Sequence, residues 1–192
     1  MNTLKAEKRS MDVKAKKLRR EGFVTGNLFG REIEGSIPLK FTKKEIEVLL
    51  KNNNKGSQVM LELDGKTYDA LIKEVDYNPL AHTVEEVDFQ ALVSNEMVHS
   101  TAEIILENEE KVMSGVLQDE LKEVAYKALP ADLVDKIKVD VAGMKIGDTL
   151  RVKDLEIAKN KNIHITTDPE AVVATVTPVH NVVPETETEA EE

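Results

Sequence analysis

The sequence contains no cysteine and no tryptophan, and only 4% of its 192 residues are aromatic. The missing cysteines exclude a disulfide framework, zinc–thiolate sites and thiol catalysis. The few aromatic residues predict a core built from aliphatic side chains. No apolar run approaches the ~20 residues that a membrane-spanning helix needs, and the first residues lack the apolar core of a signal peptide. We therefore expect a soluble, cytoplasmic protein with no membrane partner.

The sequence also lacks the spacings on which common catalytic and metal sites are built. Its four histidines, at positions 82, 99, 164 and 180, show no H-x-H or H-x-x-x-H spacing. It has no P-loop, no G-x-G-x-x-G and no G-x-S-x-G motif. Neighbouring acids such as Glu85 and Glu86 are expected by chance in a chain with 36 acidic residues. These absences argue against an enzyme and predict no cofactor, no metal and no small-molecule substrate.

The positive charge of the chain is concentrated near its start. The formal net charge is −10, and residues 93–192 carry 10 basic and 21 acidic side chains. Residues 1–20 hold eight basic and two acidic side chains, and five of the basic ones lie within positions 14–20. An acidic body with a basic edge attracts a polyanion to one face and repels it elsewhere. The basic run has two interpretations: a solvated helix face whose charges match the helix dipole, or a binding surface.

Local patterns predict a compact α+β unit in residues 1–93. A strand is expected at residues 3–8, followed by a short helix at 14–21 that ends at Gly22. Thr42 and Glu45 have the spacing of a capping box at the start of a second helix. Asp64–Gly65 predicts a tight hairpin between two strands, and Asn78–Pro79 predicts a turn before a last strand. These three strands are expected at residues 58–63, 66–75 and 84–92.

Residues 94–180 are predicted to form a second, β-rich domain with a sandwich-like arrangement. Short β-favouring segments alternate there with glycine turns and with the Asp168–Pro169 turn. Residues 129–133 favour a helical turn. Strands are expected at residues 102–106, 112–116, 136–141, 149–152, 164–166 and 171–176. Residues 181–192 are too polar and acidic to pack, so we expect a disordered acidic tail.

A series of short motifs in a fixed order resembles a known family. Leu4–Arg9 (LKAEKR), Lys14–Gly22 (KAKKLRREG) and Leu28–Gly30 (LFG) are followed by Asn78–Pro79 and Glu86–Phe89 (EVDF). Together they resemble the N-terminal domain of the twenty-fifth protein of the bacterial large ribosomal subunit, a family that includes the general stress protein Ctc. The similarity continues in the second half. Its motifs there are Leu129–Leu133 (LPADL), Lys138–Val141 (KVDV), Ile146–Asp148 (IGD) and Val152–Leu155 (VKDL). The length is similar to that of the long form of the family.

The resemblance implies a mainly β protein with short helices, in which a barrel-like N-terminal domain is followed by a β-rich C-terminal domain. It implies a structural, ribosome-associated protein of translation, linked to the stress response. Its implied partners are 5S ribosomal RNA and other large-subunit proteins. Double-helical RNA is recognised mainly by its shape, phosphates and 2′-hydroxyls. The implied RNA-binding positions are Arg9, Lys14, Lys16, Lys17, Arg19, Arg20, Phe29, Glu86 and Asp88.

Four features depart from the family pattern. Glu86 stands where histidine is usual, Phe29 replaces a tyrosine, and Asp76 replaces an amide. Thr25–Gly26 stands where Pro-Ala is usual. A carboxylate 4 Å from a phosphate is repelled by roughly 1 kcal/mol in water and by ~4 kcal/mol at an effective dielectric of 20. Loss of the hydroxyl removes a hydrogen bond that contributes about 0.5–1.5 kcal/mol. These departures support an alternative: a diverged paralogue with weakened RNA binding that acts as a protein-interaction or stress factor.

Overall fold

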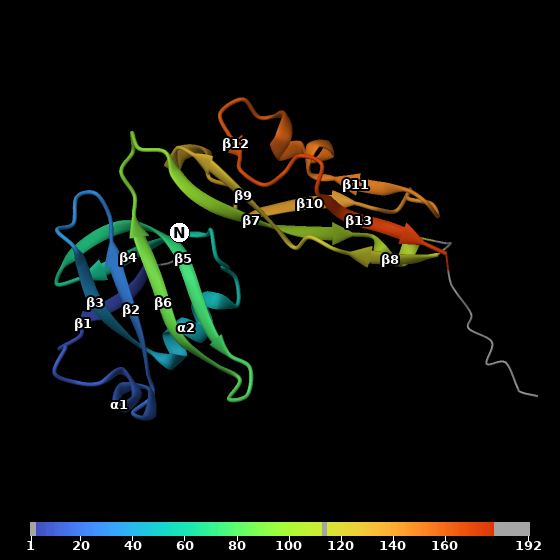
Figure 1. Cartoon of the computed structure of the whole chain (residues 1–192). Helices are drawn as coiled ribbons and strands as arrows, with labels where there is room; N and C mark the ends of the chain where they lie inside the picture. Colours follow the sequence, from blue (N-terminus) through green and yellow to red (C-terminus); the bar gives the residue numbers. More distant parts are fainter. Residues whose placement is uncertain (1–2, 113–114, 179–192) are drawn as a thin grey trace, which may run out of the picture.

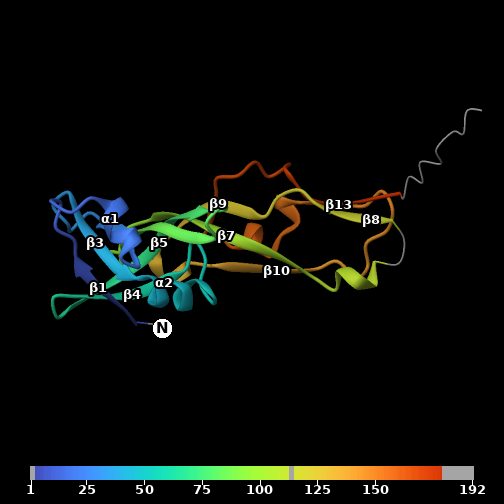
Figure 2. The same cartoon turned by 90° about the horizontal axis from the view of Figure 1, so that it is seen from below.

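The structure is a computed structural model that describes residues 3–112 and 115–178, and it is mainly β with short helices (Figure 1). This architecture confirms the predicted fold class. Six strands form a closed barrel in the first half of the chain, and two further sheets lie in the second half. Seen from below, the barrel and the second group of strands lie end to end (Figure 2). The predicted acidic tail, residues 181–192, lies outside the described residues.

The barrel has the strand order β1-β3-β2-β6-β5-β4, and β4 pairs with β1 to close it. Two of its pairings, β1 with β4 and β2 with β6, are parallel. The core inside is aliphatic apart from Phe41 and Phe89, whose rings are 5.4 Å apart. The strands are β1 (Thr3–Lys8), β2 (Phe23–Phe29), β3 (Ser36–Thr42), β4 (Gln58–Leu63), β5 (Lys66–Asn78) and β6 (Thr83–Ala91).

Two α-helices occur among the described residues, and both follow their sequence signals. Helix α1 (Ala15–Arg20) buries Leu18, and the chain turns at Gly22 into β2. Helix α2 (Lys43–Leu50) begins at the predicted capping box, because the hydroxyl of Thr42 accepts a hydrogen bond from the backbone N–H of Glu45. The predicted strand 3–8, both helix starts and the Asp64–Gly65 hairpin are therefore confirmed.

The second half contains a four-stranded sheet, β10-β7-β9-β12, and a three-stranded sheet, β11-β13-β8. Residues of both sheets share one apolar core, in which Tyr126 is fully buried and bonded through its hydroxyl to the backbone of Val134. The prediction of a second, β-rich domain is confirmed. Its strands are β7 (Val98–Glu107), β8 (Val116–Asp119), β9 (Glu123–Ala128), β10 (Lys136–Asp140), β11 (Thr149–Arg151), β12 (His164–Ile165) and β13 (Val172–Thr177). Single 3₁₀ turns form η1 (Glu109–Lys111), η2 (Pro130–Asp132), η3 (Val152–Asp154) and η4 (Glu156–Lys159).

Several element predictions were wrong or incomplete. The strand expected at residues 112–116 lies instead at Val116–Asp119, and strands β2, β3 and β9 were not predicted. The helical turn expected at residues 129–133 is the 3₁₀ turn Pro130–Asp132. Strand β9 escaped prediction because its sequence, EVAYKA, alternates in burial but contains residues that also favour helices.

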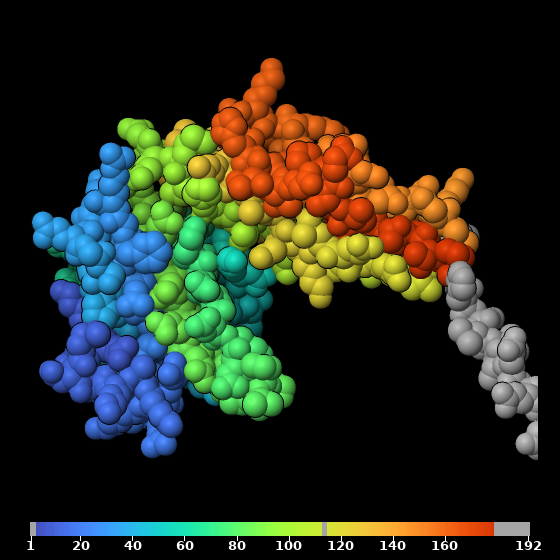
Figure 3. All heavy atoms as spheres, viewed as in Figure 1, coloured from blue at the N-terminus to red at the C-terminus, as the bar shows by residue number. Residues whose placement is uncertain are grey.

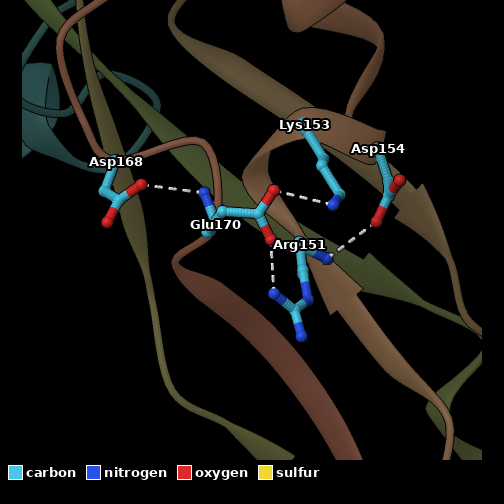
Figure 4. A network of polar contacts seen from close by, with 5 residues as sticks. All are labelled: Arg151, Lys153, Asp154, Asp168 and Glu170. Atoms are coloured by element: carbon cyan, nitrogen blue, oxygen red, sulfur yellow. Dashed lines mark hydrogen bonds and ion pairs between the residues drawn. The ribbon is translucent and has the colours of Figure 1, made fainter.

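A polar network holds the outer edge of the second half together (Figure 4). The carboxylate of Glu170 accepts hydrogen bonds from Arg151 and Lys153, and the backbone N–H of Glu170 donates to Asp168. The carboxylate of Asp154 accepts from the backbone N–H of Arg151. The two cations hold the pKa of Glu170 below its ordinary value, chiefly through the bond from Lys153. We infer that the network holds the loop before β13 in place. Because its charged groups are exposed, added salt should weaken it.

The barrel meets the second half at a tight junction around Gly56. A Cβ at this glycine would lie 1.9 Å from the carbonyl oxygen of Thr101, and its φ is +89°. Polar bonds cross the same junction from Asn54 to Glu103 and from Lys73 to the carbonyl of His99. The predicted boundary between residues 93 and 94 falls in the segment that links β6 to β7. We propose residues 1–93 and 94–180 as the two folding units that this junction joins.

The junction at Gly56 generates a stability prediction. We expect Gly56→Ala to lower the free energy of unfolding by at least about 2 kcal/mol more than Gly22→Ala does. Both glycines have a φ of +89°, but a Cβ at Gly22 would meet nothing within 4 Å. Gly22→Ala therefore reports only the cost of the left-handed backbone, about 1–2 kcal/mol. Urea unfolding of the two variants measures the difference, and equal midpoints would contradict the tight contact with Thr101.

Candidate nucleic-acid interface

Helix α1 carries more positive charge than the stability of a helix explains. Lys17, Arg19 and Arg20 lie in the last turn, where cations interact favourably with the helix dipole. Lys14 occupies the N-cap without a side-chain hydrogen bond, and Lys16 follows in the first turn, which has no acidic residue. Cations at that end oppose the dipole. Dipole matching therefore accounts for the last turn of α1 but not for Lys14 and Lys16.

A hollow of about 400 Å³ lies between α1 and the start of β6. Four basic residues line it, three from α1 and one from the first turn of α2: Lys16, Arg19, Arg20 and Lys43. We call it the basic hollow. Arg19 forms an ion pair with Glu85 at 3.3 Å, and Lys43 approaches Glu47 at 3.8 Å. Within the part of the chain that the structure describes, no ion pair is formed by Lys14, Lys16 or Arg20.

Arg9 differs from the other predicted site residues because it is built into the fold. It is half-buried, and its guanidinium donates to the carbonyl oxygen of Val13 at 3.2 Å, which holds the loop that leads into α1. Its backbone N–H donates to the carbonyl of Pro38 at 2.9 Å. Its Nε is buried without a hydrogen-bond partner among the described residues. Arg9 therefore positions the loop that leads into the basic helix α1.

Carboxylates gather beside these cations on the outer face of β5 and β6. Glu86 pairs across the two strands with Asp76, and Asp88 follows two residues later. The side-chain amide of Asn27, on the parallel strand β2, donates to Glu86 at 3.2 Å and to Asp88 at 3.1 Å. The backbone N–H of Asn27 donates to the same oxygen of Asp88 at 2.9 Å. Asp88 therefore ties β2 to β6, and this contact alone gives the acid a structural role.

The acidic cluster disturbs the ionisation of Glu86. Partial burial raises the pKa of Glu86 above its ordinary value, and the charges of Asp88 and Asp76 raise it further. Arg19 and Arg9 lower the pKa but do not cancel the rise. The predicted site residues Arg9, Arg19, Glu86 and Asp88 therefore form one electrostatic group. In this group, the carboxylates compete with any incoming anion for the two arginines.

The remaining predicted residues lie at the margins of this group. Lys17 is exposed and lies 3.8 Å from Glu21 on the same helix. Phe29 is half-buried at the far end of β2, on the same side of the strand as Asn27. Sequence reasoning missed Asn27, Lys43 and the ion pair of Glu85. Asn27 and Glu85 come together through the pairing of β2 with β6, which joins positions about sixty residues apart. Lys43 is placed by the pairing of β3 with β2. No local pattern reports either pairing.

Other classes of site receive no support from the geometry. Among residues 3–112 and 115–178, no three His, Asp or Glu side chains gather as metal ligands would. None of the helices in this part of the chain is both long and apolar enough to span a bilayer.

Two family models match the chain one after the other. Residues 4–89 match the Ribosomal L25p family, and residues 97–180 match the model described as Ribosomal protein TL5, C-terminal domain. The full-length relatives carry the name large ribosomal subunit protein bL25. The relative from Carboxydothermus hydrogenoformans is 32% identical over 190 residues, which cover 94% of each chain. The relative from Bacillus velezensis is 31% identical over 183 residues, covering 93% of this chain and 89% of its own.

The barrel and the appended β-rich domain thus correspond, in order, to the two domains of a class of bacterial ribosomal proteins. The chain belongs to the bL25 family, in the long form that carries the TL5-type C-terminal domain. This result confirms the resemblance inferred from the sequence motifs. Membership of a family of ribosomal proteins also identifies the chain as a structural component rather than an enzyme.

The raised pKa of Glu86 gives a prediction for stability against pH. A carboxyl group whose pKa is higher in the folded than in the unfolded chain stabilises the fold below its unfolded pKa, and this contribution is lost as pH rises through the folded pKa. At pH 7 the charged Glu86 is therefore unfavourable. We expect Glu86→Gln to raise the free energy of unfolding at pH 7, by less than about 1 kcal/mol because the site is partly exposed.

The gain should shrink as the pH is lowered from 7 toward the ordinary pKa of a glutamate, because the raised pKa lets wild-type Glu86 take up its proton earlier than an unperturbed carboxyl group. Chemical unfolding of both proteins across this range measures the difference. Glu34→Gln, at an exposed loop position, serves as the control and should behave like the wild type at each pH. A gain from Glu86→Gln that is constant with pH would contradict the assignment of the effect to the charge of Glu86.

Proposed function

We propose that the protein is a structural component of the large ribosomal subunit that binds 5S ribosomal RNA through the basic hollow and the exposed side of α1. The relatives named large ribosomal subunit protein bL25 support the first part of this proposal. The observation that carries the second part is the placement of Lys14, Lys16 and Arg20. They lie exposed, without ion pairs among the described residues, on a helix whose dipole two of them oppose.

The chemistry of the hollow suits a double-helical RNA. Lys16, Arg19, Arg20 and Lys43 approach it from two helices, so adjacent phosphates of one backbone are contacted from both sides. Arginine offers two parallel N–H donors to a phosphate, and lysine offers a point charge. Exchange of Glu85 for a phosphate at Arg19 costs little, because the pair is partly exposed and exposed ion pairs contribute only about 0–1 kcal/mol. RNA therefore gains the guanidinium of Arg19 without disrupting the barrel.

The acidic second half supports an orientation for the complex. Residues 93–192 carry 21 acidic and 10 basic side chains, and phosphates repel such a surface. In the proposed arrangement, 5S RNA lies against α1 and β6, and the second domain contacts neighbouring large-subunit proteins. A location in the cytoplasm on the ribosome and a role in translation follow from the same proposal.

Binding measurements with single charge-removing variants test the RNA-binding part. We expect Lys16→Ala and Arg20→Ala each to weaken binding of a bacterial 5S ribosomal RNA transcript. Each should also reduce the slope of log K against log salt by roughly 0.7–0.9, because each removes about one phosphate contact. Fluorescence anisotropy at several salt concentrations measures both quantities. Lys161→Ala, an exposed cation of the second domain, is the matched control and should change neither. Equal affinity of the wild type for 5S RNA and an unrelated duplex would overturn the proposal.

A second candidate function rests on the carboxylates beside the hollow. Glu86, Asp88 and Asp76 place negative charge where an RNA backbone would pass. If these charges weaken RNA binding, the protein is a diverged family member that acts as a protein-interaction or stress factor. Co-sedimentation separates the two functions. A ribosomal component travels with the large subunit at low salt, whereas the diverged factor stays at the top of the gradient.

The influence of Glu86 on RNA is itself testable. We expect Glu86→His to strengthen binding of 5S RNA by roughly 5-fold or more at low salt, because it removes a charge that repels phosphate by about 1 kcal/mol even in water. The Kd from anisotropy, compared with that of Glu86→Gln, separates loss of the charge from gain of an imidazole. An unchanged Kd in both variants would show that the carboxylate lies outside the reach of the bound RNA.

A further inference from the structure

The hairpin that joins β5 to β6 presents apolar side chains to solvent at its tip. Leu80 is 94% exposed and Tyr77 is 54% exposed. The chain has only three tyrosines and four phenylalanines, so an exposed ring is uncommon in this molecule. Residues 77–84 contain no acidic side chain, in contrast to the carboxylates on the strands that carry the tip. The tip is therefore an apolar surface without an acidic side chain of its own, and the nearest acids, Asp76 and Glu85, lie on the strands that flank it.

The tip is held in one conformation by its own hydrogen bonds. The side-chain oxygen of Asn78 accepts from the backbone N–H groups of Leu80 and Ala81, both at 3.1 Å. The hydroxyl of Tyr77 lies 3.1 Å from Nδ1 of His82. Leu80 is thus presented on an ordered turn rather than on a loose loop. A contact that is already ordered loses less conformational entropy when it binds.

A chain of polar contacts connects the tip to the basic hollow. The side-chain amide of Asn78 donates to one oxygen of Glu85 at 2.8 Å, and the other oxygen of Glu85 pairs with Arg19. Thr83 and Glu85, at the base of the hairpin, line the hollow itself. The tip and α1 project from the same end of the barrel (Figure 1), and the space-filling view shows them as two neighbouring lobes (Figure 3).

We propose that the tip of the β5–β6 hairpin is a second, uncharged contact for the RNA bound in the basic hollow. Leu80 and Tyr77 pack against a ribose or an unstacked base next to the phosphates that the hollow holds. This inference rests on the proposed function. RNA rather than a protein is the occupant because the tip is continuous with the residues that line the hollow, through the bond from Asn78 to Glu85. Unpaired bases stack on aromatic and apolar side chains in many RNA complexes.

The test uses Leu80→Ala in the full-length protein. Leu80 is almost fully exposed, so its removal leaves folding unchanged, and a thermal unfolding curve verifies this. We expect Leu80→Ala to weaken binding of the 5S RNA transcript roughly 5- to 30-fold, the effect of burying the lost methylenes against RNA. The salt slope should stay at the wild-type value because no phosphate contact is lost. Ile146→Ala, which truncates a half-exposed apolar residue of the second domain, is the matched control and should bind like the wild type.

The outcomes separate this inference from the function on which it rests. If the wild type binds 5S RNA and Leu80→Ala has the same Kd, the hairpin contact is wrong and the hollow stands alone. A reduced salt slope in Leu80→Ala would also overturn the inference, because the effect would then be electrostatic. If Leu80→Ala binds 5S RNA with the wild-type affinity but does not co-sediment with the large subunit, the tip contacts a neighbouring protein instead of RNA. If the wild type itself does not prefer 5S RNA, the proposed function fails first.

Hydroxyl-radical footprinting of the RNA gives an independent readout. We expect the wild type to protect the sugars that face α1 and a few adjacent nucleotides. Leu80→Ala should lose only the adjacent protection, whereas Arg20→Ala should weaken the protection that faces α1. Loss of the same nucleotides in both variants would contradict two distinct contacts.

Discussion

The close parallel approach of β2 and β6 is the constraint on which the candidate interface depends. A Cβ at Gly26 would lie 2.0 Å from the carbonyl oxygen of Val87, so only a residue without a side chain lets the two strands pair in this register. The pairing places Thr25 beside Glu86, and the residues that follow bring Asn27 to Asp88. Because α1 leads directly into β2, the same pairing also places the basic helix next to the start of β6. The fold and the interface therefore share one contact.

The electrostatics of the interface are a balance between two arrangements of charge. Arg9 and Arg19 lie near the carboxylates of β5 and β6 and lower the pKa of Glu86. The pKa is raised nevertheless, because burial and the neighbouring acids have a larger effect than the two arginines. Lys14, Lys16 and Arg20 are exposed to solvent instead, and the last two also line the basic hollow. Arg9 and Arg19 partly neutralise the acids, whereas the three exposed cations add long-range attraction. A partner with regularly spaced negative charge therefore meets the exposed cations first and competes for Arg19 second.

Local chemistry in the sequence predicted the elements but not the way in which they meet. The capping box at Thr42, the Asp64–Gly65 hairpin and the end of α1 at Gly22 each depend on residues within one turn of each other, and all three were confirmed. Parallel pairing leaves no such local trace, so the roles of Asn27 and Glu85 stayed hidden. The basic run was visible as charge, but only the structure shows that its first turn opposes the dipole. Strand β2 contains the strand-favouring residues Phe23, Val24 and Thr25, but Gly26 and Asn27, which are depleted in strands, interrupt the pattern in its middle.

The junction at Gly56 connects this interface to the acidic half of the chain. The contact with Thr101 leaves no room for a side chain, and hydrogen bonds from Asn54 and Lys73 cross the same seam. These contacts set the direction of the acidic domain's field relative to the basic hollow. In the proposed function, a polyanion that approaches from the wrong side is repelled and one that approaches α1 is drawn in. The junction therefore contributes to orientation although, in this proposal, it touches no RNA.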